Sequence, residues 1–359
     1  MRFADVLEIK NGRNQKQVEN PNGKYPIYGS GGIMGYADEY ICEPETVIIG
    51  RKGTINNPIY VETPFWNVDT AFGLQAKRDI LLPKYLYYFC VNFNFEALNT
   101  TVTIPSLTKA NLLNIEISVP PLPKQQKIVD ILSKIDVLIC ERQLQVEKLN
   151  DLVKSRFIEL FGDPVRNEKD WPMVTLGDVA EIRIGPFGTL LHKEDYIVGG
   201  HALVNPSHII DGKICTDEKL TISDEKYEEL SAYHLMIGDV VLGRRGEMGR
   251  CAVVFEDGLL CGTGSMVIRP SEKMKPYFLQ NIISSPTYKK IIEDKAVGVT
   301  MLNLNVPIVS SLAIPQLPVD MQEQFIEFMQ QTDKLKFDTK QALEKLEILK
   351  KSLMQQYFG

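Results

Sequence analysis

Apolar residues recur every three or four positions along two long tracts of the chain, 125–160 and 322–358, neither of which contains glycine or proline. Each tract follows a proline-containing segment, VPPLP at 119–123 and IPQLP at 314–318, in which a helix cannot begin early. Strong helix formers fill both tracts, so the pattern predicts two long helices whose apolar stripes form a coiled-coil seam. The seam residues predicted on this basis are Ile128, Ile135, Leu138, Leu149, Leu152, Phe325, Leu335, Leu346 and Leu349.

The two tracts repeat one pattern, because they align without a gap and place Asp136 opposite Asp333. The similarity extends upstream, where VIIGRKG at 47–53 matches VVLGRRG at 240–246. Each half of the chain is therefore one globular segment followed by one long helix, and this repeat has to be recognised before a fold is assigned. The predicted boundaries are 1–121 for the first globular segment, 122–162 for its helix, 163–317 for the second globular segment and 318–359 for its helix.

Helix length predicts how the two tracts pair. At about 1.5 Å per residue each helix is roughly 54 Å long. A globular segment of about 155 residues has a diameter of roughly 38 Å, so it cannot easily return the chain to the start of the first helix. We therefore expect an antiparallel pair with one globular segment at each end, related by a pseudo two-fold axis. The alternative is two separate surface helices, each lying on its own domain.

The globular segments show short apolar runs bounded by glycine, proline and asparagine, which is typical of strands. One short helix is predicted in each, at 84–93 and at 276–285. The expected fold class is α/β (α+β), with two β-rich domains that are each followed by a long helix. The predicted strands are 46–50, 58–62, 71–75, 239–243, 251–255 and 265–269.

Composition limits the classes of protein that fit. The net charge of −6 offers no overall basic excess, so any surface for nucleic acid has to be a local one. The six cysteines include no close CxxC pair, which favours reduced, buried thiols over a zinc site. No apolar run is long enough to cross a bilayer, and we expect a cytoplasmic protein without a membrane partner.

Polar loops rich in glycine carry the candidate binding residues. Basic and amide side chains beside glycines suit contacts to phosphates and base edges, and the G-R-K/R-G pattern occurs at matching places in both halves. A solvated turn with basic residues would have a similar sequence. The candidate DNA-binding residues are Arg13, Asn14, Lys16, Ser30, Arg51, Lys52, Thr54, Arg183, His192, Asn205, His208, Arg244, Arg245 and Arg250.

Catalytic and cofactor motifs are absent from the sequence. The glycines at 29–35 weakly resemble a loop for a nucleotide or S-adenosylmethionine, but they open no predicted helix and no Asn/Asp-Pro-Pro-Tyr/Phe tetrapeptide accompanies them. There is no phosphate-binding loop of the P-loop type. The histidines all lie in the second half, without the spacing of metal ligands: His192, His201, His208 and His234.

Taken together, these motifs resemble the specificity subunit of type I restriction-modification systems over essentially the whole chain. The resemblance rests on VPPLP and IPQLP before the paired helices, on the run-ins at 107–120 and 302–315, on LFGDP at 160–164 and on KDWPMVTLGDV at 169–179. It implies two target recognition domains, each reading half of a bipartite DNA sequence, with the helices as a ruler between them. It also implies two methyltransferase (modification) subunits docked on the helices, and restriction/translocase subunits in the full complex.

The resemblance further implies that this chain is not an enzyme and binds no cofactor, because S-adenosylmethionine, ATP and magnesium belong to the partner subunits. An alternative function is a non-catalytic coiled-coil scaffold with two adaptor domains that bind proteins. That alternative explains the repeat but leaves the matched Arg-Gly loops unexplained. A stand-alone methyltransferase or nuclease would need catalytic motifs that the chain lacks.

Overall fold

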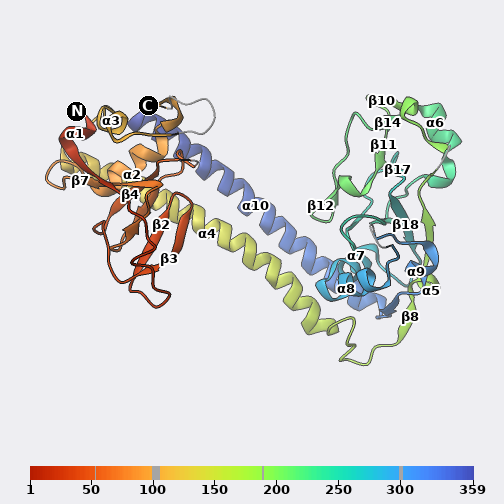
Figure 1. Cartoon of the computed structure of the whole chain (residues 1–359). Helices are drawn as coiled ribbons and strands as arrows, with labels where there is room; N and C mark the ends of the chain where they lie inside the picture. Colours follow the sequence, from red (N-terminus) through yellow and green to blue (C-terminus); the bar gives the residue numbers. More distant parts are fainter. Residues whose placement is uncertain (53, 99–105, 188–189, 299–301) are drawn as a thin grey trace. The chain divides into compact units, whose positions relative to one another are not determined.

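The computed structural model describes residues 1–52, 54–98, 106–187, 190–298 and 302–359 (Figure 1). The chain forms two compact units. Unit 1 comprises Met1–Val146 and Asp338–Gly359, and unit 2 comprises Glu147–Phe337. Each unit contains its own main hydrophobic core together with parts of both long helices.

Unit 1 is built on a four-stranded antiparallel sheet with the strand order β1-β7-β4-β5. A smaller sheet, β3-β2-β6, lies beside it, with β2 parallel to β6. The elements are α1 (Phe3–Val6), β1 (Leu7–Asn11), β2 (Tyr25–Gly29), β3 (Gly32–Ala37), β4 (Thr46–Gly50), β5 (Ile59–Val61), β6 (Trp66–Asn67), β7 (Ala71–Ala76), α2 (Pro83–Asn92), the short 3-10 helix η1 (Phe95–Leu98) and α3 (Lys109–Leu113).

Unit 2 repeats this plan. Its main sheet has the order β9-β18-β15-β16, and β11 pairs in parallel with β17 as β2 does with β6. The elements are β8 (Met173–Thr175), α5 (Leu176–Val179), β9 (Ala180–Ile184), η3 (Lys193–Asp195), β10 (Tyr196–Ile197), β11 (His201–Val204), η4 (Pro206–His208), β12 (Ile209–Ile210), β13 (Lys213–Ile214), β14 (Thr221–Ile222), α6 (Asp224–Glu229), η5 (Ser231–Tyr233), β15 (Val240–Gly243), β16 (Cys251–Val253), β17 (Leu260–Cys261), β18 (Ser265–Pro270), α7 (Pro276–Ser284), α8 (Pro286–Lys295), α9 (Val306–Ser310) and β19 (Ala313–Pro315).

The long helices are α4 (Leu122–Phe161) and α10 (Val319–Phe358). In unit 1 the start of α4 packs against the end of α10, where Asp136 and Lys350 form an ion pair of 2.6 Å. In unit 2 the end of α4 packs against the start of α10, where Lys336 donates to Asn150 over 3.3 Å. The helices are therefore antiparallel in both units, as predicted, and the alternative of two helices that each lie on a separate domain is wrong.

A buried glutamine anchors the start of α4 in unit 1, and another anchors the start of α10 in unit 2. Gln125 is fully buried, and its side chain accepts from Leu82 N (2.9 Å) and donates to the carbonyls of Ile80 and Pro120. Leu82 is the residue that caps the N-terminus of α2. Unit 2 repeats the arrangement with Gln322, which accepts from Lys275 N, the N-cap of α7, and donates to Lys273 and Leu317.

The phase of the predicted seam is correct for some residues and wrong for others. Ile128, Ile135 and Phe325 are buried, and Leu149 and Leu346 are half-buried. The other four predicted seam residues lie on the outer face of the helices with exposed fractions between 40% and 55%: Leu138, Leu152, Leu335 and Leu349.

The residue that follows each of these four leucines is half-buried and lies on the inward face of its helix instead. Ile139 and Val153 are half-buried on α4, while Lys336 and Lys350 are half-buried on α10 and contact the opposite helix. The prediction failed because both helices carry apolar residues on more than one face. Packing against a partner selects the inward face, and it selected one that includes polar side chains.

The cysteines follow the predicted pattern in part. Cys42, Cys90, Cys251 and Cys261 are buried free thiols, whereas Cys140 and Cys215 are exposed. Among the described residues, no helix is both long enough and apolar enough to span a membrane.

Candidate nucleic-acid interface

In each unit, the polar loops that carry the candidate residues meet at one end of the main sheet. In unit 1 the register pairs Asn11 with Phe72 and Gly50 with Ala71, so the loops after β1 and β4 leave the sheet beside the turn that precedes β7. The tip of the β2–β3 hairpin also lies here, because a Cβ atom added at Gly50 would come 3.0 Å from the Cβ of Ser30. The same added atom would lie 2.0 Å from the carbonyl oxygen of Thr54, so this tight turn requires glycine.

A single short segment holds these loops together. We call residues 67–71 of unit 1 the central turn. Five backbone hydrogen bonds, made by this turn or by the residues bonded to it, hold the surrounding loops in place. They run from Gly12 N to Ala71 O (3.3 Å), from Val68 N to Tyr28 O (3.0 Å), from Arg51 N to Thr70 O (2.7 Å), from Ala71 N to Val68 O (3.0 Å) and from Leu107 N to Arg51 O (2.9 Å).

Unit 2 has the same central turn at residues 261–265, with each of the five bonds in an equivalent place. Because the bonds join backbone atoms, they do not depend on the side chains that the loops carry. They run from Gly185 N to Ser265 O (3.0 Å), from Gly262 N to Val204 O (3.0 Å), from Arg244 N to Gly264 O (3.0 Å), from Ser265 N to Gly262 O (3.0 Å) and from Leu304 N to Arg244 O (3.0 Å).

Most candidate side chains of unit 1 are available to a ligand. The loop after β1 is attached to the central turn through its backbone, with Trp66 Nε1 donating to the carbonyl of Arg13 over 3.0 Å. The guanidinium of Arg51 lies 5.7 Å from the ring centroid of Phe72, which orients it. Gly53 of the predicted Arg-Gly loop lies outside the described residues. The exposed candidates are Arg13, Asn14, Lys16, Arg51, Lys52 and Thr54, and Ser30 is half-buried.

In unit 2 the two adjacent arginines of the matching loop differ. Arg245 is exposed, whereas Arg244 is half-buried and donates through Nε to the carbonyl of Leu304 over 3.2 Å. Burial, and then the charge of Arg245, lower the pKa of Arg244 from its ordinary value. Arg244 therefore stabilises the loop, and Arg245 is the side chain that can reach a ligand.

Arg250 also stabilises this loop. Its guanidinium is 2.6 Å from Glu247 and donates to the carbonyl of Pro206, while Glu247 also pairs with Lys289 of α8 at 2.9 Å. The hydrogen bonds from Arg250 and Lys289 lower the pKa of Glu247 to about 2. The carboxylate thus stays ionised at neutral pH and keeps both cations engaged with the protein.

The remaining candidates of unit 2 also include both an exposed side chain and side chains that are bonded or buried within the protein. Exposed His192 begins η3 and donates through its backbone N–H to Asp195, whereas Arg183 bonds the carbonyl of Ala232 and pairs with Glu181. The prediction for His208 is wrong. Its ring is buried because η4 turns it back, and Nδ1 lies 2.7 Å from the carbonyl oxygen of Leu203. Asn205 is half-buried in the same turn.

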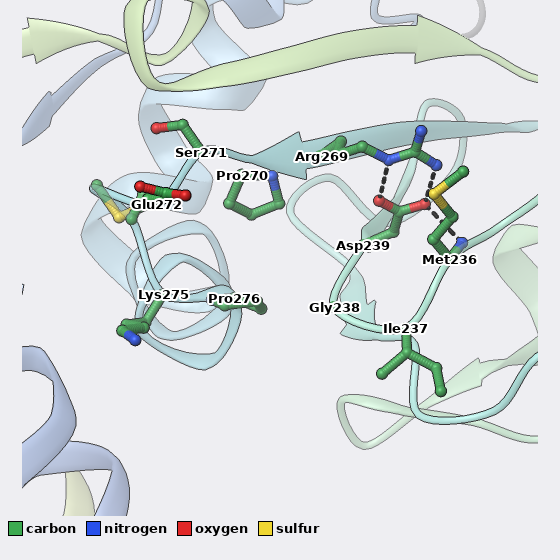
Figure 2. A pocket seen from close by; sticks show the side chains of 11 residues that line it. Met236, Ile237, Gly238, Asp239, Arg269, Pro270, Ser271, Glu272, Lys275 and Pro276 are labelled. Atoms are coloured by element: carbon green, nitrogen blue, oxygen red, sulfur yellow. Dashed lines mark hydrogen bonds and ion pairs between the residues drawn. The ribbon is translucent and has the colours of Figure 1, made fainter.

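The opposite end of each sheet is hollowed, and each hollow contains an ion pair. In unit 2 the hollow is lined by residues 236–239, 269–272 and 274–276, and Figure 2 shows Asp239 paired through both oxygens with Arg269. In unit 1 the equivalent hollow contains an ion pair of 2.8 Å between Arg78 and Glu45. We assign no ligand to either hollow. Among the described residues, no group of three or more His, Cys, Asp or Glu side chains could hold a metal ion.

Comparison with known proteins decides the family. The family model described as type I restriction modification DNA specificity domain matches residues 1–148 and again residues 168–348. The chain belongs to this family. The specificity subunit of the type I restriction enzyme MjaVIII from Methanocaldococcus jannaschii is 25% identical over 329 residues, which covers 86% of this chain and 74% of that protein.

Two further similarities agree with the family. A putative type I restriction enzyme specificity subunit from Haemophilus influenzae is 29% identical over 171 residues, covering 45% of this chain and 44% of that protein. The crystal structure of the type I restriction-modification S subunit from M. genitalium aligns with a TM-score of 0.65 at 17% identity, covering 100% of this chain and 95% of that one. At this identity the structural match establishes a shared fold. The family's domain therefore occurs twice in this chain, once in each half.

The contrast between the two arginines yields a testable prediction. Replacing Arg245 by alanine is expected to weaken DNA binding without unfolding unit 2, because its side chain is exposed. A phosphate contact would weaken binding to all sequences and reduce the salt slope by about one, whereas a base contact would relax one position at a cost of about 1 to 3 kcal/mol. Binding titrations at several salt concentrations separate the two cases. Arg166→Ala, which removes an exposed arginine from the loop after α4, is the control, and equal behaviour of both variants would contradict the assignment.

Proposed function

We propose that the chain is the DNA sequence-specificity subunit of a type I restriction-modification complex, in which unit 1 and unit 2 each read one half of a bipartite double-stranded DNA target. The observation that carries this proposal is the repeated central turn. Five equivalent backbone bonds hold it in both units, yet the side chains on the surrounding loops differ. A constant scaffold with variable side chains suits two domains that bind the same kind of ligand and distinguish different sequences.

The long helices supply a surface for the partner subunits. Leu138 and Leu335 occupy equivalent positions of the repeat and are both exposed, as are Leu152 and Leu349. Exposed apolar side chains repeated at matching positions suit two copies of one partner. We propose that two methyltransferase subunits dock here and that restriction/translocase subunits complete the assembly. The family match favours this function over a coiled-coil scaffold with two adaptor domains.

In this function the chain performs no catalysis. S-adenosylmethionine, ATP and magnesium act on the partner subunits, and the present chain supplies sequence recognition and assembly. The test is to co-express the chain with its modification subunits and to map methylated adenines and cytosines by sequencing. The expected result is one bipartite sequence with a fixed spacer. A single uninterrupted target, or methyl transfer by the purified chain alone at a rate that follows its concentration, would contradict the proposal.

The helices also predict the spacer between the two half-sites. One heptad inserted into α4 after Val146 and one into α10 after Phe337 would preserve the antiparallel register and add about 10 Å, or roughly three base pairs at 3.4 Å each. We expect the spacer to lengthen while both half-sites stay unchanged, as measured by methylation mapping. The control is a heptad in α4 alone, which shifts one helix against the other and should abolish assembly. An unchanged spacer with full activity would show that the helices do not set the distance.

A further inference from the structure

Each central turn presents an exposed side chain at its tip, and the shared backbone bonds leave the identity of that side chain free to vary. In unit 1 the tip of the turn is Asp69, which is exposed, and in unit 2 the equivalent position is Thr263, which is also exposed. The backbone on either side of Asp69 is fixed, since Val68 N donates to the carbonyl of Tyr28 and the carbonyl of Thr70 accepts from Arg51 N. The side chain of Val68 is buried, and that of Thr70 is exposed beside the tip. The turn therefore fixes where the tip lies, and the sequence determines which chemical group it presents.

The turn of unit 1 is held more tightly than an ordinary surface loop. Asn67, two residues before the tip, is fully buried, and its Nδ2 donates to the carbonyl of Ala71 across the turn over 3.1 Å. The backbone carbonyl of Asn67 also accepts from Arg13 N over 2.8 Å. A side chain on a turn fixed in this way loses little conformational entropy on binding, which favours selective contacts.

The charge of Asp69 is informative because its surroundings are basic. The loops bonded to this turn carry Arg13, Arg51 and Lys52, all exposed. A carboxylate on a surface that meets phosphates is repelled by them and weakens non-specific binding. It becomes favourable when it accepts a hydrogen bond from the exocyclic amine of a base. Cytosine N4 and adenine N6 both present such an amine in the major groove, and cytosine N4 is the usual partner of a carboxylate.

We propose that Asp69 and Thr263 are equivalent specificity-determining residues, one at the tip of each central turn. Asp69 accepts a hydrogen bond from the exocyclic amine of a base, cytosine by preference, in the half-site bound by unit 1. Thr263 offers a hydroxyl and a methyl group, so it selects by different contacts at the corresponding position of the other half-site. This inference rests on the proposed function, since it names the residues through which each unit distinguishes its sequence.

The test compares the methylation pattern and DNA affinity of the assembled complex carrying Asp69→Asn with those of the unmodified complex. We expect discrimination at one position of the first half-site to fall by about tenfold to a hundredfold, while the second half-site is unchanged. Asp69→Thr, which copies the side chain of unit 2, should change the preferred base at the same position. Thr263→Val should affect only the second half-site.

The control is Glu62→Gln, which neutralises an exposed acid just beyond β5, at the end of the sheet away from the loops. It should alter neither half-site. Unchanged sequence preference in Asp69→Asn would overturn the proposal. A uniform gain in affinity for all sequences would also overturn it, because Asp69 would then act as a counter-charge to its neighbours. Failure of the proposed function is a separate result, seen when the unmodified complex selects no bipartite sequence.

Discussion

Replacing Phe325 by alanine is expected to destabilise unit 2 by about 3 to 5 kcal/mol, the usual cost of removing a buried aromatic side chain. Phe325 is fully buried near the start of α10, and its ring centroid lies 5.4 Å from those of Phe157 and Phe161 near the end of α4. These three rings join both long helices to the core of unit 2. Unfolding should therefore abolish recognition of the second half-site.

The tryptophans allow this effect to be assigned to one unit. The chain contains two, Trp66 in unit 1 and Trp171 in unit 2, and Trp171 Nε1 donates to the carbonyl of Phe161 over 3.1 Å. In a Trp66→Phe background, fluorescence during denaturant unfolding reports on unit 2. The matched control is Phe337→Ala on the same helix, where the side chain is 60% exposed and the cost should stay below about 1 kcal/mol. Similar midpoints for the two variants would contradict the assigned packing.

The second large effect is expected in unit 1, from Gln125→Ala. This change removes three hydrogen bonds from a fully buried side chain and leaves Leu82 N–H and the carbonyls of Ile80 and Pro120 without these bonds. Each buried polar group deprived of its partner costs about 1 to 3 kcal/mol, so a loss of about 2 to 4 kcal/mol is expected after partial relaxation. Two of the lost bonds, those to Leu82 and Ile80, connect the start of α4 to the segment that leads into α2.

Denaturant unfolding in a Trp171→Phe background follows unit 1 through Trp66. Gln126→Ala is the control. Gln126 is the next residue of the same helix, and its exposed side chain donates a hydrogen bond to Asp130 on the helix surface. It should change the free energy of unfolding by less than about 0.5 kcal/mol. Gln322→Ala should have the same effect in unit 2 as Gln125→Ala has in unit 1. A Gln125→Ala protein as stable as Gln126→Ala would show that the duplicated glutamine has no structural role.

The sequence predicted elements well where local pattern and length agree. The strands at 46–50 and 71–75 and the helix at 84–93 correspond to β4, β7 and α2 within one or two residues. Sheet order was not predictable, because β1 pairs with β7 through contacts between residues far apart in the chain. The short helix α8 was missed, since it begins with proline directly after α7 and has no long apolar stripe.

In the candidate site, too, local sequence pattern predicted some features, whereas others depend on contacts between distant residues. The sequence identified the Arg-Gly loops, but it could not separate Arg245 from Arg244, whose guanidinium is engaged by the carbonyl of Leu304. It also could not show that His208 turns into the unit. Asp69 was not a candidate, because an isolated acid in an acidic chain carries no signal until the turn that holds it is known.

The sequence by itself determined the duplication, the two long helices, their antiparallel pairing and the family, because these depend on patterns that extend over tens of residues. The tertiary structure alone decided which helix face is buried. The leucines repeated between the helices, Leu138 with Leu335 and Leu152 with Leu349, face outward. It also decided which loops meet at the central turns, since backbone hydrogen bonds between distant segments carry no signature in side-chain identity.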